Sequence, residues 1–140
     1  MDKKIIAILV LLVFVISCGG DSGADLKNLT ADYTALDTKF QEKESGIKSY
    51  KEYQEFVAEK KKALEDVLEK YKDSVKSDGI DILKAKILVK TGSFADAEKL
   101  VDEVIAAEGK LVDEARMVKV QSLLGKKKVD DAYNVFQHGF

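Results

Sequence analysis

The sequence contains no proline and no tryptophan, and it has one cysteine and one histidine among its 140 residues. A single cysteine cannot form a disulfide within the chain, so a folded body must be stabilised by packing. The lone His138 has no second histidine or free cysteine beside it, although metal binding or catalysis by histidine needs such partners. We therefore expect no enzyme activity, no metal site and no bound cofactor. Charged residues interleaved with aliphatic ones, without proline, favour long helices, and the sequence predicts an all-α fold.

Neither sign of charge is in large excess. The sequence has 23 Lys and Arg and 25 Asp and Glu, which gives a formal net charge of −2. The longest basic runs are two lysine triplets, at 60–62 and 126–128. Neither run is long enough for a patch that binds nucleic acid or anionic lipid. We expect no nucleic-acid partner.

A long hydrophobic run occurs only at the start of the chain. Two lysines, Lys3 and Lys4, precede the uncharged stretch 5–16, and the polar run 19–23 ends it. A helix needs about 20 apolar residues to cross the hydrocarbon core of a bilayer, whereas a shorter run is typical of a secretory signal. Residues 1–17 are therefore predicted to be a cleaved signal peptide. Residues 18–24 follow as a flexible tether and 25–140 as the folded body.

The end of this leader, Val15-Ile16-Ser17-Cys18, resembles the lipobox of bacterial lipoproteins. A branched apolar residue stands three before the cysteine, and a small residue stands directly before it. The resemblance implies that the Cys18 sulfur receives a diacylglyceryl group, that the leader is removed, and that Cys18 becomes the fatty-acylated (palmitate-type) first residue. One lipid chain holds a protein weakly and two or more hold it stably. The resemblance therefore implies a lipid-anchored protein of the bacterial cell envelope. Gly19, in place of an aspartate after the cysteine, favours the outer over the inner membrane.

Apolar residues at three-four spacing predict six helices after the leader. Turn residues at 45–46, 77–79, 91–93, 108–110 and 124–125 separate them. We expect helices over about 25–43, 48–72, 80–91, 94–107, 111–125 and 129–137, with short loops that make them antiparallel hairpins. The hairpins would be about 25–73, 79–108 and 111–137. The apolar side of the second helix is predicted to include Tyr50, Tyr53 and Val57, and that of the sixth Val129, Ala132, Val135 and Phe136.

An alternative remains for the first two helices. Apolar residues from Leu26 to Tyr71 keep one heptad register through Gly46, as in a rod about 70 Å long that dimerises as a coiled coil. Gly46 costs about 1 kcal/mol inside a helix, which favours a hairpin.

The segment 82–101 resembles a tetratricopeptide repeat, with Ala85, Gly92, Phe94 and Ala97 at its small, turn, aromatic and crossing positions. The next unit repeats them as Val120, Gly125, Val129 and Ala132. Ala97 and Ala132 are 35 residues apart, against a family period of 34, and an extra lysine in 126–128 accounts for the difference. The resemblance covers 47–137 and implies a right-handed superhelix of antiparallel hairpins.

The same resemblance implies a partner groove on the first helix of each hairpin, where the family binds peptides and extended chains. Its candidate residues here are Lys86, Val89, Lys90, Met117 and Gln121. We expect a membrane-anchored scaffold or assembly adaptor with a protein or peptide partner. Two alternatives stay open: a ligand-binding accessory lipoprotein of a transporter, and a structural coiled-coil spacer that associates with itself.

Overall fold

The computed structural model describes residues 22–140, which form six α-helices and no strand. The helices are α2 (Ser22–Glu44), α3 (Tyr50–Lys70), α4 (Asp78–Thr91), α5 (Phe94–Ala106), α6 (Val112–Gly125) and α7 (Val129–Gly139). The all-α prediction is confirmed, and every helix end lies within three residues of the expected one. The predicted leader and Cys18 lie outside the described residues. Within residues 22–140, no helix is both long enough and apolar enough to cross a membrane.

Side chains at the helix ends explain where several helices begin and stop. The Ser49 hydroxyl accepts a hydrogen bond from the backbone N–H of Glu52 at the start of α3, and Ser77 does the same for Ile80 at the start of α4. Such caps stabilise a helix by about 1 kcal/mol. Gly92 ends α4 with φ +86°, the left-handed conformation that glycine commonly adopts after a helix.

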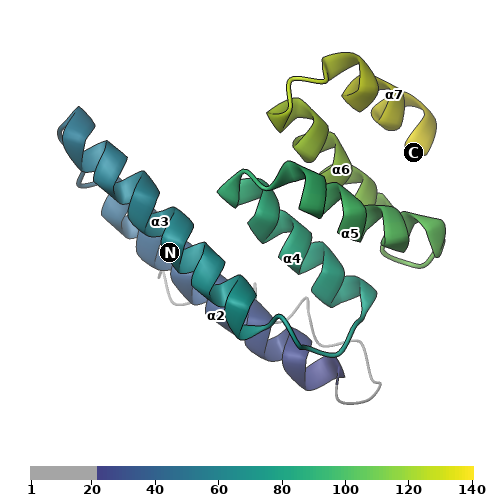
Figure 1. Cartoon of the computed structure of the whole chain (residues 1–140), viewed down its shortest axis with the longest axis horizontal. Helices are drawn as coiled ribbons and strands as arrows, with labels where there is room; N and C mark the ends of the chain where they lie inside the picture. The colour runs from purple at the N-terminus through teal and green to yellow at the C-terminus, as the bar shows by residue number, and fades with distance from the viewer. Residues whose placement is uncertain (1–21) are drawn as a thin grey trace, which may run out of the picture.

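The first two helices form an antiparallel hairpin rather than a continuous rod (Figure 1). Residues 45–49 reverse the chain, and the rings of Phe40 and Phe56 pack edge to face at 5.6 Å near the turn. At the other end, Asp32 accepts hydrogen bonds from the Tyr71 hydroxyl at 2.7 Å and from Lys70 at 2.5 Å. Because α2 begins at Ser22, residues 22–24 of the predicted tether are helical.

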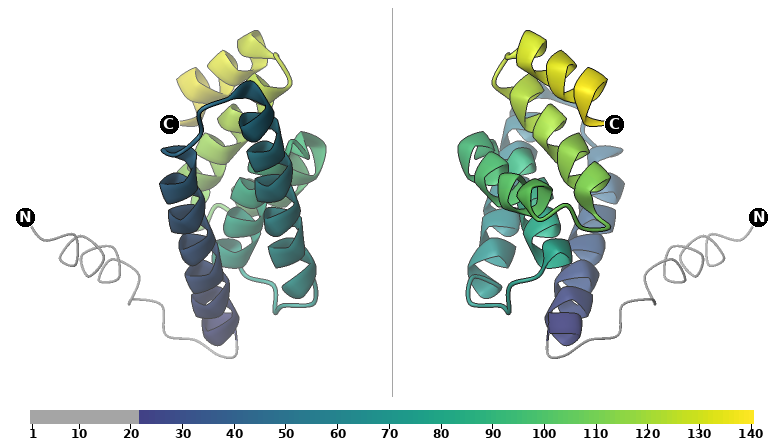
Figure 2. Two further views of the ribbon diagram at one scale, coloured as in Figure 1. Left: turned by 90° about the vertical axis from the view of Figure 1, so that its left-hand side faces the viewer. Right: turned by 90° about the vertical axis from the view of Figure 1, so that its right-hand side faces the viewer.

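The six helices contact one another in a regular order. Each packs against the next along the chain, and α2, α4 and α6 also contact each other in turn, whereas α3, α5 and α7 do not. The three pairs α2–α3, α4–α5 and α6–α7 therefore stack side by side, with α2–α3 and α7 at opposite ends (Figures 1 and 2).

Two apolar cores hold the pairs together, and α4 contributes to both. Ile80 and Ile87 pack with Leu29 and Leu64 of the first hairpin, while Ile82 packs with α5 and α6. Each fully buried aliphatic side chain contributes about 1.5–3 kcal/mol. Three alanines in the second core are fully buried and let the backbones approach closely: Ala85, Ala97 and Ala115.

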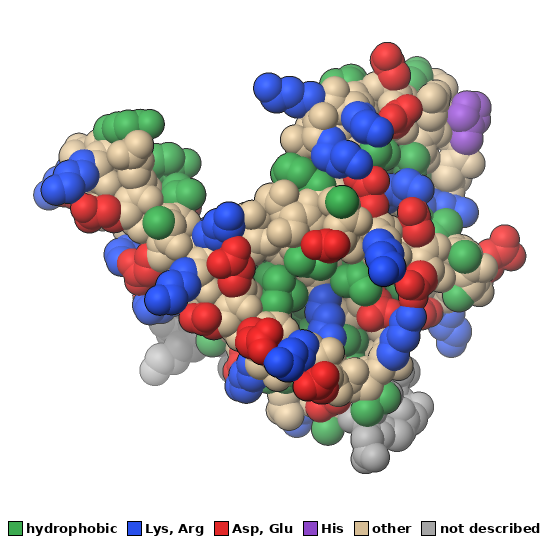
Figure 3. Space-filling view, in the orientation of Figure 1, with side chains coloured by type: hydrophobic (Ala, Val, Ile, Leu, Met, Phe, Trp, Pro, Cys, Tyr) green, Lys and Arg blue, Asp and Glu red, His purple; other side chains and the backbone are tan. Residues whose placement is uncertain are grey.

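Several residues predicted to point inward are instead exposed. In α3, Tyr50 is 76% exposed, and Tyr53 and Val57 are also open to solvent, while Phe56 is buried. The reason is length: α3 has 21 residues and α4 has 14, so at 1.5 Å per residue α3 projects about 10 Å further. Figure 3 shows hydrophobic side chains on this projecting end. In α7 the predictions for Val129 and Phe136 were wrong, and Ala132 alone is buried.

The two later hairpins repeat one turn geometry at an offset of 35 residues. After α4, the N–H groups of Gly92 and Ser93 bond to the carbonyls of Val89 and Leu88; after α6, those of Lys127 and Lys128 bond to Leu124 and Leu123. Both turns are Schellman motifs. The left-handed residue of the second turn is Lys127, with φ +60°. The predicted match of Gly125 to Gly92 was therefore wrong by two positions. Gly125 is the last residue of α6 and lies against the Phe94 ring.

Candidate functional site

The candidate groove residues lie on α4 and α6. These helices and α2 contact one another in turn, and we call the layer that they form the three-helix face. Two lysines of α4 connect the layer. Lys86 forms an ion pair with Glu114 of α6, and Lys90 donates a hydrogen bond to Asp37 of α2 at 2.9 Å. The two lysines therefore reach in opposite directions and join the first helices of all three hairpins.

Lys90 contacts an aromatic ring as well as a carboxylate. Its ammonium lies 5.1 Å from the centre of the Tyr33 ring, and its side chain is 39% exposed. Burial lowers the pKa of the Lys90 ammonium, but hydrogen bonds with Tyr33 and Asp37 outweigh burial and hold that pKa above its ordinary value. A lysine has three donors, so each bridging ammonium keeps hydrogen-bonding capacity for an incoming group.

The other three predicted residues do not join the lysines in one cluster. Val89 is half-buried and packs against the core of α4, α5 and α6. Met117 and Gln121 are exposed on α6, at helical spacing after Glu114, so they share its side of the helix. The three-helix face is thus a polar strip on α4 with a mixed, exposed strip beside it on α6.

Sequence reasoning missed the carboxylate partners of both lysines. Asp37 lies 53 positions before Lys90, and Glu114 lies 28 positions after Lys86. Periodicity identifies residues that share one helix face, but it gives no information about pairs between helices. The repeat offset of 35 residues could have shown only that the helices are neighbours.

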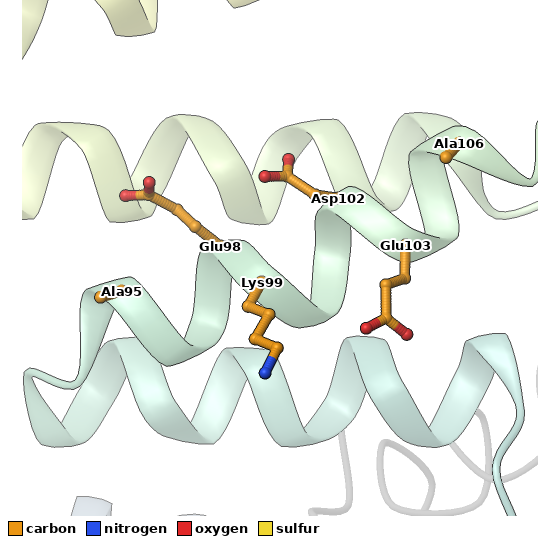
Figure 4. Close-up of a pocket in the computed structure, with 6 residues that line it drawn as sticks. All are labelled: Ala95, Glu98, Lys99, Asp102, Glu103 and Ala106. Carbon is orange, nitrogen blue, oxygen red and sulfur yellow. The ribbon is translucent and has the colours of Figure 1, made fainter.

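A hollow runs along the outer side of α5, with a volume of about 520 Å³ (Figure 4). Figure 4 shows Glu98 and Asp102 pointing to one neighbouring helix, and Lys99 and Glu103 to the other. Each carboxylate has a cation: Asp102 pairs with Lys119 at 2.7 Å, Glu98 with Lys126 at 3.2 Å, and Glu103 with Lys76. The hydrogen bond from Lys76 lowers the pKa of Glu103. These ion pairs tie α5 to its neighbours.

A second hollow, of about 410 Å³, lies at the projecting end of the first hairpin between α2 and α3. Lys43 and Glu59 form an ion pair across it, and Phe56 forms its floor on the apolar side. The hydrogen bond from Lys43 lowers the pKa of Glu59. The hollow is open and polar at its rim, and it holds no residue of the predicted groove.

The remaining titratable groups of residues 22–140 include His138 and Asp81. Within residues 22–140, no group of three or more His, Cys, Asp or Glu side chains is placed to hold a metal ion. His138 is exposed in α7. The pKa of the Asp81 carboxyl is raised by burial at the start of α4, and that carboxyl lies near the Lys76–Glu103 pair.

Comparison with known proteins adds no relative to this description. No protein-family model, curated protein or solved structure matches the chain. The features from which a function can be inferred are therefore the predicted leader with Cys18, the ordered stack of hairpins and the three-helix face.

Proposed function

We propose that this protein is a lipid-anchored binding scaffold of the bacterial cell envelope, preferentially at the outer membrane. In this proposal Cys18 carries the lipid, and residues 22–140 form a tetratricopeptide-like right-handed array that binds a protein or peptide partner on the three-helix face. The observation that carries the proposal is the pair of lysine bridges, Lys86 to Glu114 and Lys90 to Asp37, on the layer of first helices.

The order of helix contacts supports the tetratricopeptide-like part. In such an array the first helix of each hairpin contacts its own partner, the preceding hairpin's second helix and the preceding first helix. The contacts of α4 and α6 follow this order. The repeated Schellman turns, 35 residues apart, support it independently of side-chain packing.

The chemistry of the face suits a partner segment with acidic or backbone carbonyl groups. Surface ion pairs contribute about 0–1 kcal/mol each, so an incoming carboxylate can share or replace Asp37 or Glu114 without unfolding the array. Gln121 offers both a donor and an acceptor beside them, and it is exposed. An extended peptide can therefore be held by mixed polar contacts along α4 and α6.

The anchoring part places the body close to the membrane. Only residues 19–21 separate Cys18 from α2, a distance of at most about 14 Å along an extended chain. Replacing Cys18 with alanine should move the protein from the membrane fraction to the soluble fraction of lysed cells. Continued membrane residence of Cys18→Ala would refute the lipid anchor.

The partner is tested by crosslinking in intact cells, followed by purification from detergent-solubilised membranes. The variant Lys86→Gln/Lys90→Gln should lose a partner that the unchanged protein retains. The matched control is Lys119→Gln/Lys126→Gln, which removes two equally paired lysines that face α5 instead. Loss with both variants would assign the effect to general charge. Retention with both would remove the three-helix face from the proposal.

A purification that yields no protein partner would favour a small ligand. A ligand present at about 100 times its dissociation constant raises the free energy of unfolding by about 2.7 kcal/mol. A thermal-shift screen of the same preparation would detect that stabilisation.

A further inference from the structure

The last described hairpin carries a set of exposed apolar side chains, which we call the open end. Six large side chains of α6, α7 and the residue after α7 compose it, each between 44 and 62% exposed: Met117, Leu124, Val129, Tyr133, Phe136 and Phe140. Their counterparts 35 residues earlier are Ile82, Val89, Phe94, Glu98, Val101 and Ile105.

Those six earlier residues make the contacts that hold α6 in place. Ile82 and Val101 are buried in the core shared with α6, and Val89 and Ile105 pack against that core. The Ser122 hydroxyl of α6 donates to the Phe94 carbonyl at 2.9 Å and to the Glu98 carboxylate at 3.0 Å. The open end is therefore the surface that, one hairpin earlier, binds the first helix of the following hairpin.

The α5–α6 contact defines what such a helix must look like. The side of α6 toward the preceding hairpin carries Ala115, Val118 and Ser122, which are all buried. Gly125 completes it, and a Cβ there would lie 2.3 Å from the Phe94 ring. Small residues at positions i, i+3 and i+7 thus let the large side chains of the preceding hairpin fill the interface.

One described helix has an uncovered side of this kind. Ala31, Thr34 and Thr38 of α2 have the same spacing as Ala115, Val118 and Ser122, and all three are exposed. Threonine has nearly the shape of valine, so these three residues match in size. Gln41, which is exposed, stands at the position of Gly125, and the open end carries Val129 at the position of Phe94. The corresponding sides of α4 and α6 are already covered by the hairpins before them, and α2 lies at the opposite end of the stack from α7 (Figure 1).

We propose that the open end of one copy binds the Ala31–Thr34–Thr38 side of α2 of a second copy, head to tail. The contact continues the stack of hairpins across two molecules. A heterologous contact of this kind leaves one free surface at each end, so it builds short open arrays rather than closed dimers. The open end shares Met117 with the three-helix face, but the inference uses neither the two lysine bridges nor their partner.

The charges at the two surfaces are compatible with this contact. The acidic residues Glu98 and Asp102 of α5 correspond to the neutral Tyr133 and Gln137 of α7. An incoming helix therefore needs no lysine at the positions that pair with these two carboxylates in the α5–α6 contact. One helix laid on two buries less than the roughly 1,600 Å² of a standard interface. The association is therefore weak and rises with protein concentration.

The test is sedimentation velocity of the full chain in mild detergent, over concentrations up to about 1 mM, the range of weak complexes. The open-end variants are Phe136→Glu and Tyr133→Lys, and the α2 variant is Thr34→Arg. The matched control is Val75→Glu, which places a charge on a comparably exposed valine outside both surfaces. Circular dichroism melting of each variant verifies that it keeps its helices.

The unchanged protein and Val75→Glu should form species larger than dimers as concentration rises. Either blocked variant alone should stay monomeric, but a mixture of Phe136→Glu with Thr34→Arg should stop at one-to-one dimers, because one intact contact remains. Three results would overturn the proposal: a monomer at all concentrations, loss with the open-end variants alone, which would indicate α7 pairing with α7, or assembly that survives both substitutions. If Phe136→Glu loses helix content, Tyr133→Lys decides.

Discussion

Replacing Gly92 with alanine isolates the energetic effect of one backbone angle. Gly92 adopts φ +86°, and a Cβ added there meets no atom within 4 Å. The substitution therefore causes no clash, and its effect comes from the left-handed conformation alone. That conformation costs a residue with a Cβ about 1–2 kcal/mol. Alanine recovers about 0.4–1 kcal/mol by restricting the unfolded chain, so a net loss of about 1 kcal/mol is expected.

Lys127 provides the mirror experiment, because it occupies the same Schellman position one hairpin later with φ +60°. Lys127→Gly should remove the backbone strain and leave stability unchanged or raised by up to about 1 kcal/mol. Urea and thermal unfolding of both variants measure the difference, and 1 kcal/mol corresponds to about 4 °C in Tm for a domain of this size. If Gly92→Ala is as stable as the parent, or Lys127→Gly is clearly less stable, the assignment of the two turns as equivalents is wrong.

Three further predictions follow from the packing and the buried carboxyl. Gly125→Ala should destabilise the fold by about 1–3 kcal/mol through overpacking against the Phe94 ring, and adding Phe94→Leu should recover part of the loss in a urea-denaturation cycle. Asp81→Asn should raise Tm at pH 7. Burial raises the folded-state pKa of this carboxyl above 3.8, so ionisation of Asp81 disfavours folding as pH rises past that value. The gain in Tm should vanish in melts near pH 3. Phe40→Ala should cost about 3–5 kcal/mol because Phe40 is 1% exposed, whereas Phe136→Ala should cost far less; equal losses in denaturant titrations would contradict the assigned burial.

The helices were predictable because their signals are local. Three-four apolar spacing located all six, and residues such as Ser77 and Gly92 determined where α4 begins and ends. The exposure of Tyr50 and Phe136 was not predictable in the same way. Periodicity shows which side of a helix is apolar, but whether another helix covers that side depends on relative helix lengths and on what lies beyond the last hairpin.

The candidate site was predictable only as a set of positions on helices. Lys86 and Lys90 lie on the expected layer, but their pairing with Glu114 and Asp37 depends on side chains far apart in sequence. The repeat register was misassigned for a related reason. Glycine is the usual residue at a left-handed turn position, so Gly125 was matched to the turn that Lys127 makes.

The strictly local order of helix contacts has a consequence for synthesis. No described helix contacts another more than two places along the chain, and proteins rich in local contacts fold in microseconds to milliseconds. A ribosome adds only about 5–20 residues per second, so each hairpin can fold against the previous one as soon as it emerges. The growing chain then exposes a single uncovered hairpin surface at a time. The open end of α6 and α7 is that same surface, retained after the last described helix has formed.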